Sequence, residues 1–187
     1  GHWIISRATQ VVGVSNAACE FARHLGARNT ERIPNGVVVP NKSGKVSDVG
    51  SPVILYVGRL IQAKGVQDLI EATKIVNVKW KCSLAIVGNG PYREQLQKLA
   101  GVDDNIRFYG ELTGEKLDNI YHSARVFINP SYSEGLPTSV MEAAALGTPV
   151  IATNVGGTRE IIEDEVTGTL VEPRNVKGLT EAILMTL

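Results

Sequence analysis

The chain has 187 residues, 43% of them hydrophobic and 20% charged, which is the composition of a folded globular protein and excludes an intrinsically disordered one. Its 19 Lys and Arg residues balance its 19 Asp and Glu residues, so no overall charge is present to attract nucleic acid or anionic lipid. No apolar run approaches the roughly 20 residues needed to span a bilayer, and Cys19 and Cys82 lack CxxC spacing, which favours free thiols over a zinc site or a disulfide framework.

The N-terminal part of the chain contains a single strand-then-helix unit. Residues 10–15 form an apolar run that predicts a strand, and residues 16–25 have the pattern of a helix. One such unit cannot bury its own apolar strand. Residues 1–33 are therefore predicted to be the terminal unit of an otherwise absent N-terminal domain, with a strand that is free to pair with a second copy of the chain. Residues 34–52, which become rich in Gly, Ser, Lys and Asp, are predicted to be a linker.

Residues 53–187 alternate short apolar runs with amphipathic stretches, the pattern of a parallel sheet that is covered on both faces. The repeated strand-then-helix order predicts an α/β fold, a doubly wound parallel sheet of the Rossmann-like type, with its ligand crevice at the carboxyl ends of the strands. Strands are predicted at 53–57, 84–87, 106–109, 126–128, 150–152 and 169–171, and helices at 66–73, 92–99, 114–123, 139–146, 158–162 and 176–185.

Two cations, Arg59 and Lys64, follow the first of these strands. Neighbouring cations can hold a diphosphate through charge-assisted hydrogen bonds. A Walker A loop is excluded, because Lys64 precedes Gly65 instead of standing in a Gly-Lys-Ser or Gly-Lys-Thr sequence. The structural alternative is that Arg59 caps the loop and Lys64 is a solvated charge.

Two carboxylates, Glu134 and Glu142, follow the strand predicted at 126–128. An acid can accept hydrogen bonds from the vicinal hydroxyls of a ribose or a hexose. Glu134 has no standard capping role for a helix that begins near Thr138, whereas Glu142 also fits a capping box with Ser139. Together the cations and the carboxylates predict a sugar-nucleotide site, on the condition that the two pairs meet.

Other polar features are less informative. Arg93 stands where a dinucleotide fingerprint that begins at Gly88 needs its third glycine or alanine, which argues against NAD or FAD binding. Arg159 and Glu160 are expected to cap and charge the N-terminus of a helix.

Seven short motifs follow one another along the chain. They are Val57-Gly58-Arg59-Leu60 with Lys64-Gly65, Ile86-Val87-Gly88-Asn89-Gly90-Pro91, Phe108-Tyr109-Gly110, Asn129-Pro130-Ser131, the block from Glu134 to Glu142, Gly147-Thr148-Pro149-Val150-Ile151-Ala152, and Gly156-Gly157-Thr158-Arg159-Glu160-Ile161-Ile162. In this order they resemble the retaining nucleotide-sugar glycosyltransferases of the GT-B fold, family 4, and the resemblance covers nearly the whole chain. It identifies the chain with the C-terminal, donor-binding domain of that family. Ile61 and Gln62 depart from residues that are often charged in the family, and Pro137 stands where many members carry Gly.

The resemblance implies a role for each of these residues. Arg59 and Lys64 would clasp the donor diphosphate and offset the charge that develops on the leaving nucleotide, without a metal ion or another cofactor. Glu134 would lie beside the hydroxyls of the transferred sugar and is implied, with Arg59 and Lys64, to be catalytic. The donor would be a UDP-sugar or a GDP-sugar. The implied donor-binding residues are Gly58, Gly88, Gly110, Glu111, Leu112, Gly135, Leu136, Pro137, Thr138 and Glu142, the last of them at the ribose.

The resemblance also implies what surrounds this chain. The acceptor site would belong to the missing N-terminal domain, so the chain is expected to bind a nucleotide-diphosphate sugar without transferring the sugar. The full-length enzyme would be cytoplasmic, and a peripheral association with the cytoplasmic face of the membrane stays open. Two alternatives also stay open, a nucleotide-sugar epimerase of the GT-B fold and a non-catalytic binding domain. Analysis of the products of the full-length enzyme would separate them.

Overall fold

The computed structural model describes residues 2–38 and 53–187, so most of the predicted linker, 39–52, lies outside the described residues. The described chain forms two parallel sheets with helices around them. The helices are α1 (His2–Ile5), α2 (Asn16–His24), α3 (Val66–Asn77), α4 (Arg93–Ala100), α5 (Glu115–Ser123), α6 (Thr138–Ala145) and α7 (Val176–Thr186), with short 3-10 helices η1 (Gln62–Lys64) and η2 (Gly156–Glu160). The strands are β1 (Val11–Gly13), β2 (Thr30–Arg32), β3 (Val53–Val57), β4 (Ser83–Val87), β5 (Ile106–Gly110), β6 (Ala124–Asn129), β7 (Val150–Thr153) and β8 (Thr169–Val171).

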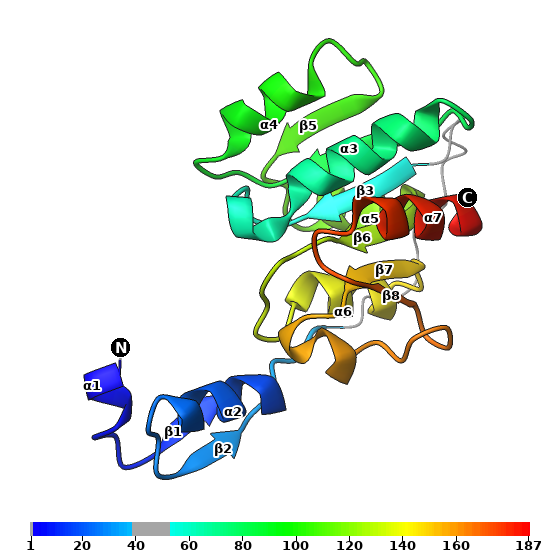
Figure 1. Ribbon diagram of the computed structural model, residues 1–187. Coiled ribbons are helices and arrows are strands. Elements are labelled where there is room, and N and C mark those ends of the chain that lie inside the picture. Colours follow the sequence, from blue (N-terminus) through cyan, green and yellow to red (C-terminus); the bar gives the residue numbers. More distant parts are fainter. Residues whose placement is uncertain (1, 39–52) are drawn as a thin grey trace.

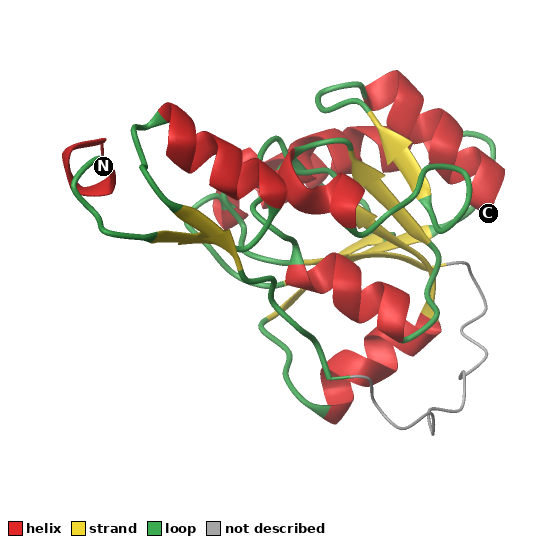
Figure 2. Cartoon of the chain, turned by 90° about the horizontal axis from the view of Figure 1, so that it is seen from below, coloured by secondary structure: helices red, strands yellow, loops and turns green. Residues whose placement is uncertain are grey.

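The larger sheet has six strands, all parallel, in the order β5-β4-β3-β6-β7-β8. The chain runs outward from β3 to one edge, returns to place β6 beside β3, and then continues to the other edge. Helices cover both faces of the sheet (Figure 1, Figure 2). This order confirms the predicted doubly wound parallel sheet. It also places the topological switch point, where ligands bind in such sheets, between β3 and β6.

Apolar side chains of the strands point alternately to the two faces of the larger sheet. On one face Ile54 and Ile86 pack against α3, α4 and α7, and on the other face Leu55 and Phe127 pack against α5 and α6. All four side chains are fully buried. Because burial of one such side chain contributes about 1.5–3 kcal/mol, the two layers hold the strands, and therefore the loops at their carboxyl ends, in fixed positions.

The N-terminal unit consists of α1, α2 and a separate sheet in which β1 and β2 are parallel. The strand predicted at 10–15 is therefore shorter than expected and already has a partner within the chain, which corrects the expectation of an unpaired strand. α2 begins after Ser15, whose hydroxyl oxygen accepts a hydrogen bond of 3.0 Å from the backbone N–H of Ala18. This is a regular N-cap, and it explains why the helix begins at Asn16, as predicted.

Glu160 joins the N-terminal unit to the larger domain. Its Oε1 accepts hydrogen bonds from the backbone N–H groups of Asn16, at 2.7 Å, and Ala17, at 3.3 Å. Its Oε2 lies 3.1 Å from Nε of Arg32, and the Glu160 side chain is only 14% exposed. A carboxylate at this place satisfies free N–H groups and the positive end of the α2 dipole. The helix that Glu160 caps therefore lies 144 residues away in the sequence.

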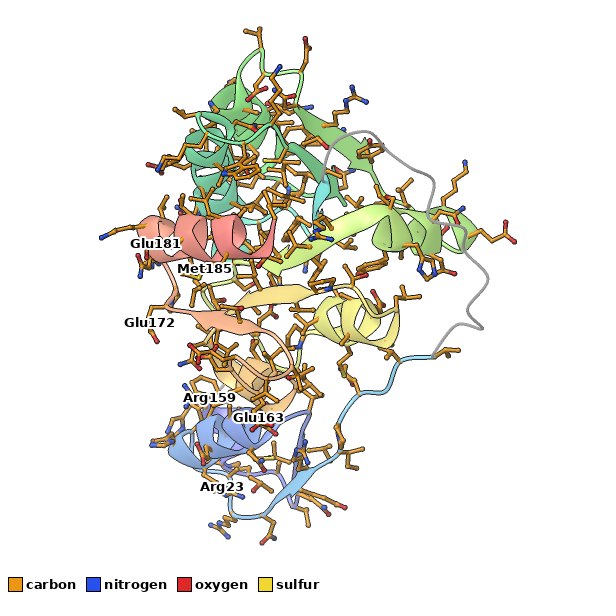
Figure 3. The ribbon with its side chains drawn as sticks, turned by 90° about the vertical axis from the view of Figure 1, so that its right-hand side faces the viewer. Arg23, Arg159, Glu163, Glu172, Glu181 and Met185 are labelled. Atoms are coloured by element: carbon orange, nitrogen blue, oxygen red, sulfur yellow. The ribbon has the colours of Figure 1, made fainter. Side chains whose placement is uncertain are left out.

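The segment around Glu160 is a 3-10 helix, η2, where an α-helix was predicted at 158–162. Its backbone bonds span three residues, as from Thr158 N to the carbonyl of Val155. α2 and η2 lie against each other, and Figure 3 shows them together, with the label Arg23 on α2 and Arg159 on η2.

Glu160→Ala is expected to loosen this joint. The free energy of unfolding should fall by about 1–2 kcal/mol, because the substitution removes a helix cap and leaves Arg32 unpaired. Hydrogen exchange of the Asn16 and Ala17 amides should accelerate. Glu181→Ala, which removes an exposed acid from α7, is the matched control and should change neither quantity. Unchanged exchange at Asn16 and Ala17 in Glu160→Ala would contradict the role of the joint.

Cys19 and Cys82 are free thiols, as predicted, and the structure shows that both are buried. Within residues 2–38 and 53–187, every helix is too short or too polar to cross a membrane.

Candidate functional site

The loops on either side of the switch point carry the three residues that were predicted to be catalytic. The loop after β3 contains Arg59 and Lys64, and the loop after β6 contains Glu134. β3 and β6 are neighbours in the sheet, so their carboxyl ends lie side by side. Residues 70 positions apart in the sequence, Lys64 and Glu134, therefore meet at one edge of the sheet.

Backbone contacts hold these two loops together. The N–H of Tyr132 donates a hydrogen bond of 2.8 Å to the carbonyl of Ala63. Gly65 ends the β3 loop with a φ of +65°, and a Cβ at this position would lie 1.9 Å from the carbonyl oxygen of Pro130. Only glycine combines that left-handed conformation with so close an approach. The position of Lys64 thus depends directly on the β6 loop.

Lys64 and Glu134 form a two-point ion pair. Nζ of Lys64 lies 2.7 Å from Oε1 and 2.8 Å from Oε2 of Glu134. The Lys64 side chain is 24% exposed and that of Glu134 is 8% exposed. A charge with so little access to solvent needs a partner, and here each group is the partner of the other.

Two further side chains hold the Glu134 carboxylate. Oγ of Ser131 lies 2.6 Å from Oε1 of Glu134, and Nδ2 of Asn129 lies 3.3 Å from the same oxygen. Both residues are buried. They belong to a motif that is recognisable in the sequence, but no role was predicted for either of them. The sequence feature that could have indicated such a role is that both polar residues stand at the end of β6, which is otherwise mostly apolar.

The carboxylate of Glu142, on α6, is held by a residue of the neighbouring helix α5. The hydroxyl of Tyr121, on α5, donates a hydrogen bond of 3.0 Å to Oε2 of Glu142, on α6. The capping-box alternative for Glu142 is wrong, because α6 begins at Thr138 with Pro137 as its N-cap residue and has no side-chain cap. Ser139 therefore lies inside the first turn and cannot act as the cap.

Two buried tyrosines donate hydrogen bonds to site residues. Besides Tyr121, Tyr56 donates from its hydroxyl to the backbone carbonyl of Arg59 at 3.0 Å. Burial raises the pKa of Tyr56 well above its usual value, and the charge of Glu134 adds to this effect. Burial likewise raises the pKa of Tyr121, with further contributions from the charge and the hydrogen bond of Glu142. Both phenols therefore remain protonated donors at physiological pH.

A pocket of about 490 Å³ lies between the loops after β3 and β6, at the carboxyl edge of the sheet. A second pocket of about 400 Å³, between α5 and α6, adjoins it and shares Leu117, Thr138 and Glu142 with it. Asn35 also lines the first pocket, although no role was predicted for it from the sequence. The predicted site residues that line the first pocket are Gly58, Arg59, Lys64, Glu134, Leu136, Pro137, Thr138 and Glu142.

The pocket does not reach the other predicted donor-binding residues, which are Gly88, Gly110, Glu111, Leu112 and Gly135. The N–H of Gly88 donates to the carbonyl of Gly110 at 2.7 Å, which joins the loops after β4 and β5 along the rim of the sheet. Leu112 packs on the core of the α5 and α6 face. Gly135 accepts a hydrogen bond of 3.0 Å from the N–H of Gly157. A direct contact of these five residues with a donor stays a prediction.

The pocket combines opposite charges in a way that suits a polar, anionic ligand. Arg59 and Lys64 can hold phosphate oxygens, and Glu134 and Glu142 can accept hydrogen bonds from hydroxyls. In the part of the chain that the structure describes, no group of three or more His, Cys, Asp and Glu side chains is arranged to hold a metal ion.

Residues 40–187 match the family model described as glycosyl transferases, group 1. The chain belongs to the group 1 glycosyltransferases. The match includes both loops of the pocket, and the fold is that of the C-terminal half of GT-B glycosyltransferases, as the sequence predicted.

Known glycosyltransferases resemble this chain over most of its length. A putative teichuronic acid biosynthesis glycosyltransferase of Bacillus subtilis is 30% identical over 96% of the chain and 47% of its own length. A GDP-mannose-dependent phosphatidylinositol monomannoside mannosyltransferase of Mycobacterium tuberculosis is 35% identical over 71% of the chain and 37% of its own length. The structure of Anabaena HepE in complex with UDP and glucose superimposes with a TM-score of 0.83 at 22% identity, over 95% of this chain and 53% of that one. The glycosyltransferase chain described here thus spans less than half the length of these two curated relatives.

Proposed function

We propose that this chain is the donor-binding half of a retaining hexosyltransferase, which moves a hexose from a nucleotide-diphosphate sugar to an acceptor. The observation that carries the proposal is the convergence of Arg59, Lys64, Glu134 and Glu142 on one pocket at the switch point of the sheet. Two cations and two acids at one crevice match a ligand that has both a diphosphate and hydroxyl groups.

Each side chain has a distinct part in this proposal. Arg59 and Lys64 bind the diphosphate and stabilise the negative charge that develops on it when the glycosidic bond breaks. Glu134 accepts hydrogen bonds from hydroxyls of the transferred sugar, and its ion pair with Lys64 keeps the sugar next to the diphosphate. Glu142 accepts hydrogen bonds from the ribose.

The donor in this proposal is a UDP-sugar or a GDP-sugar. Anabaena HepE forms a complex with UDP and glucose, and the mycobacterial relative is GDP-mannose-dependent. The acceptor site lies in the part of the longer protein that this chain does not include. The chain should therefore bind a donor but not transfer sugar, and measurable transfer by the chain alone would overturn this part of the proposal.

A thermal-shift panel tests the proposed site. The chain should be stabilised by UDP or GDP and their sugars, in preference to ADP. A ligand at 100 times its dissociation constant adds about 2.7 kcal/mol to the free energy of unfolding, which gives an easily measured shift. The double variant Arg59→Ala with Lys64→Ala should lose the shift. If no nucleotide stabilises the wild type, or if the double variant retains the shift, the diphosphate assignment is wrong.

A further inference from the structure

Tyr121 is held at its backbone, its ring and its hydroxyl, which gives the hydroxyl a defined position. The residue is 1% exposed, and its ring packs against Phe127 with a distance of 5.6 Å between the ring centroids. Its backbone carbonyl accepts a hydrogen bond of 3.1 Å from Oγ1 of Thr148, in the loop between α6 and β7. The hydroxyl at the other end reaches α6, where it donates to Oε2 of Glu142.

The Glu142 carboxylate receives its only hydrogen bond from a described residue through that hydroxyl. Oε2 is occupied by Tyr121 at 3.0 Å, and Oε1 has no hydrogen-bond partner among residues 2–38 and 53–187. Glu142 lines both adjoining pockets, so the carboxylate is accessible to a ligand. One oxygen is thus anchored to the protein, and the other can accept a hydrogen bond from outside.

We infer that Tyr121 is a positioning residue that orients Glu142 toward the vicinal hydroxyls of a ribose, and that the site consequently selects ribonucleotides over 2′-deoxyribonucleotides. This inference rests on the proposed function, because it requires a nucleotide in the pocket. An unanchored carboxylate loses rotational freedom when it binds a diol, whereas an anchored one has lost that freedom already. A 2′-deoxyribose keeps its 3′-hydroxyl but leaves the oriented acceptor without the 2′-hydroxyl donor, and sites that hydrogen-bond a hydroxyl reject analogues that lack it.

The competing explanation is that Glu142 only satisfies the buried Tyr121 hydroxyl. That explanation predicts no effect of Tyr121 on the choice between ribose and deoxyribose. The structure offers a matched control in Tyr56, which is also 1% exposed and whose hydroxyl donates to the Arg59 carbonyl on the diphosphate side of the pocket. Tyr→Phe removes one buried hydroxyl at either position, but only Tyr121 contacts the proposed ribose acceptor.

The test is isothermal titration calorimetry of the chain with UDP, GDP and ADP and with the 2′-deoxy form of each. The wild type should bind the preferred ribonucleotide at least about tenfold more tightly than its deoxy form, the discrimination expected for one hydrogen bond to a charged group. Tyr121→Phe should bring this ratio close to one, mainly by weakening the ribonucleotide. Tyr56→Phe should weaken both forms equally and keep the ratio.

Glu142→Gln is a second, independent test of the inferred role of Tyr121. This variant should also reduce the ratio of ribonucleotide to deoxyribonucleotide affinity, and adding Tyr121→Phe to it should cause little further change, because both act through one carboxylate. Thermal unfolding of each variant checks that the fold is kept. If the wild type binds a nucleotide but Tyr121→Phe keeps the full ratio, the positioning role is wrong and the proposed function stands. If Glu142→Gln keeps the full ratio, the ribose role of Glu142 in the proposed function is wrong as well. If the wild type binds no nucleotide, the proposed function fails and this inference fails with it.

Discussion

Lys64→Ala is expected to weaken the binding of UDP or GDP by about 10- to 100-fold, the equivalent of losing one or two charge-assisted hydrogen bonds. The ammonium group is only partly exposed and is fixed between the two oxygens of Glu134 at 2.7 Å and 2.8 Å. It is therefore already ordered before a diphosphate arrives, and little conformational entropy is lost on binding. Titration calorimetry with each nucleotide measures the effect directly.

Two comparisons make the Lys64 experiment specific. Lys177→Ala removes an 86% exposed lysine from α7, where it pairs with Glu181, and should leave nucleotide affinity unchanged. Glu134→Gln keeps Lys64 and an amide oxygen that can still accept a hydrogen bond from its ammonium, so UDP affinity should fall much less than in Lys64→Ala. Equal losses in Lys64→Ala and Glu134→Gln would indicate that the pair acts only as a structural support.

Gly65→Ala is expected to have the largest effect on stability, a loss of about 3 kcal/mol or more in the free energy of unfolding. The new Cβ would lie 1.9 Å from the carbonyl oxygen of Pro130, and alanine would also have to adopt a φ of +65°. The loops after β3 and β6 would have to separate, which would move Lys64 away from Glu134. Urea denaturation gives the free energy, and nucleotide binding by the folded fraction should fall as well.

The matched control for this substitution is Gly147→Ala. Gly147 has a similar φ of +75° at the C-terminal end of α6, but nothing lies within 4 Å of the position that its Cβ would occupy. Gly147→Ala should therefore lower the free energy of unfolding only by the cost of the left-handed conformation, about 1–2 kcal/mol. If the two variants lose the same amount, the close approach of Gly65 to Pro130 has no energetic importance.

Much of the fold follows from local patterns in the sequence. The six strands of the larger sheet lie where apolar runs of strand length occur, and six of the seven predicted helices are α-helices in the structure. The segment at 158–162 is the exception: it forms a 3-10 helix although its composition favoured an α-helix. Its side chains pack on α2, and this contact with a distant part of the chain leaves no periodic signal in the local sequence.

Some residues of the candidate site are likewise indicated by the local sequence, whereas the role of others depends on contacts that only the folded structure shows. Arg59, Lys64, Glu134 and Glu142 could be selected from the sequence because charged residues directly after apolar strands or in the first turns of a helix indicate a crevice in a doubly wound sheet. Asn129 and Ser131 could be placed next to them but given no function, because a short polar side chain at the end of a strand can serve many purposes. The structure supplies that function by aiming both at Glu134.

Residue chemistry and the strand-then-helix pattern along the chain thus predict a donor pocket and the loops that form it. The partners of Glu142, which lines the pocket, and of Glu160, which does not, were decided by packing. Tyr121 reaches Glu142 because α5 and α6 cover the same face of the sheet, and Glu160 caps α2 because η2 lies against it. Each of these contacts joins segments at least 21 residues apart. Sequence periodicity reports only which face of an element is buried, so the partner across an interface is set by how the helices and sheets come together.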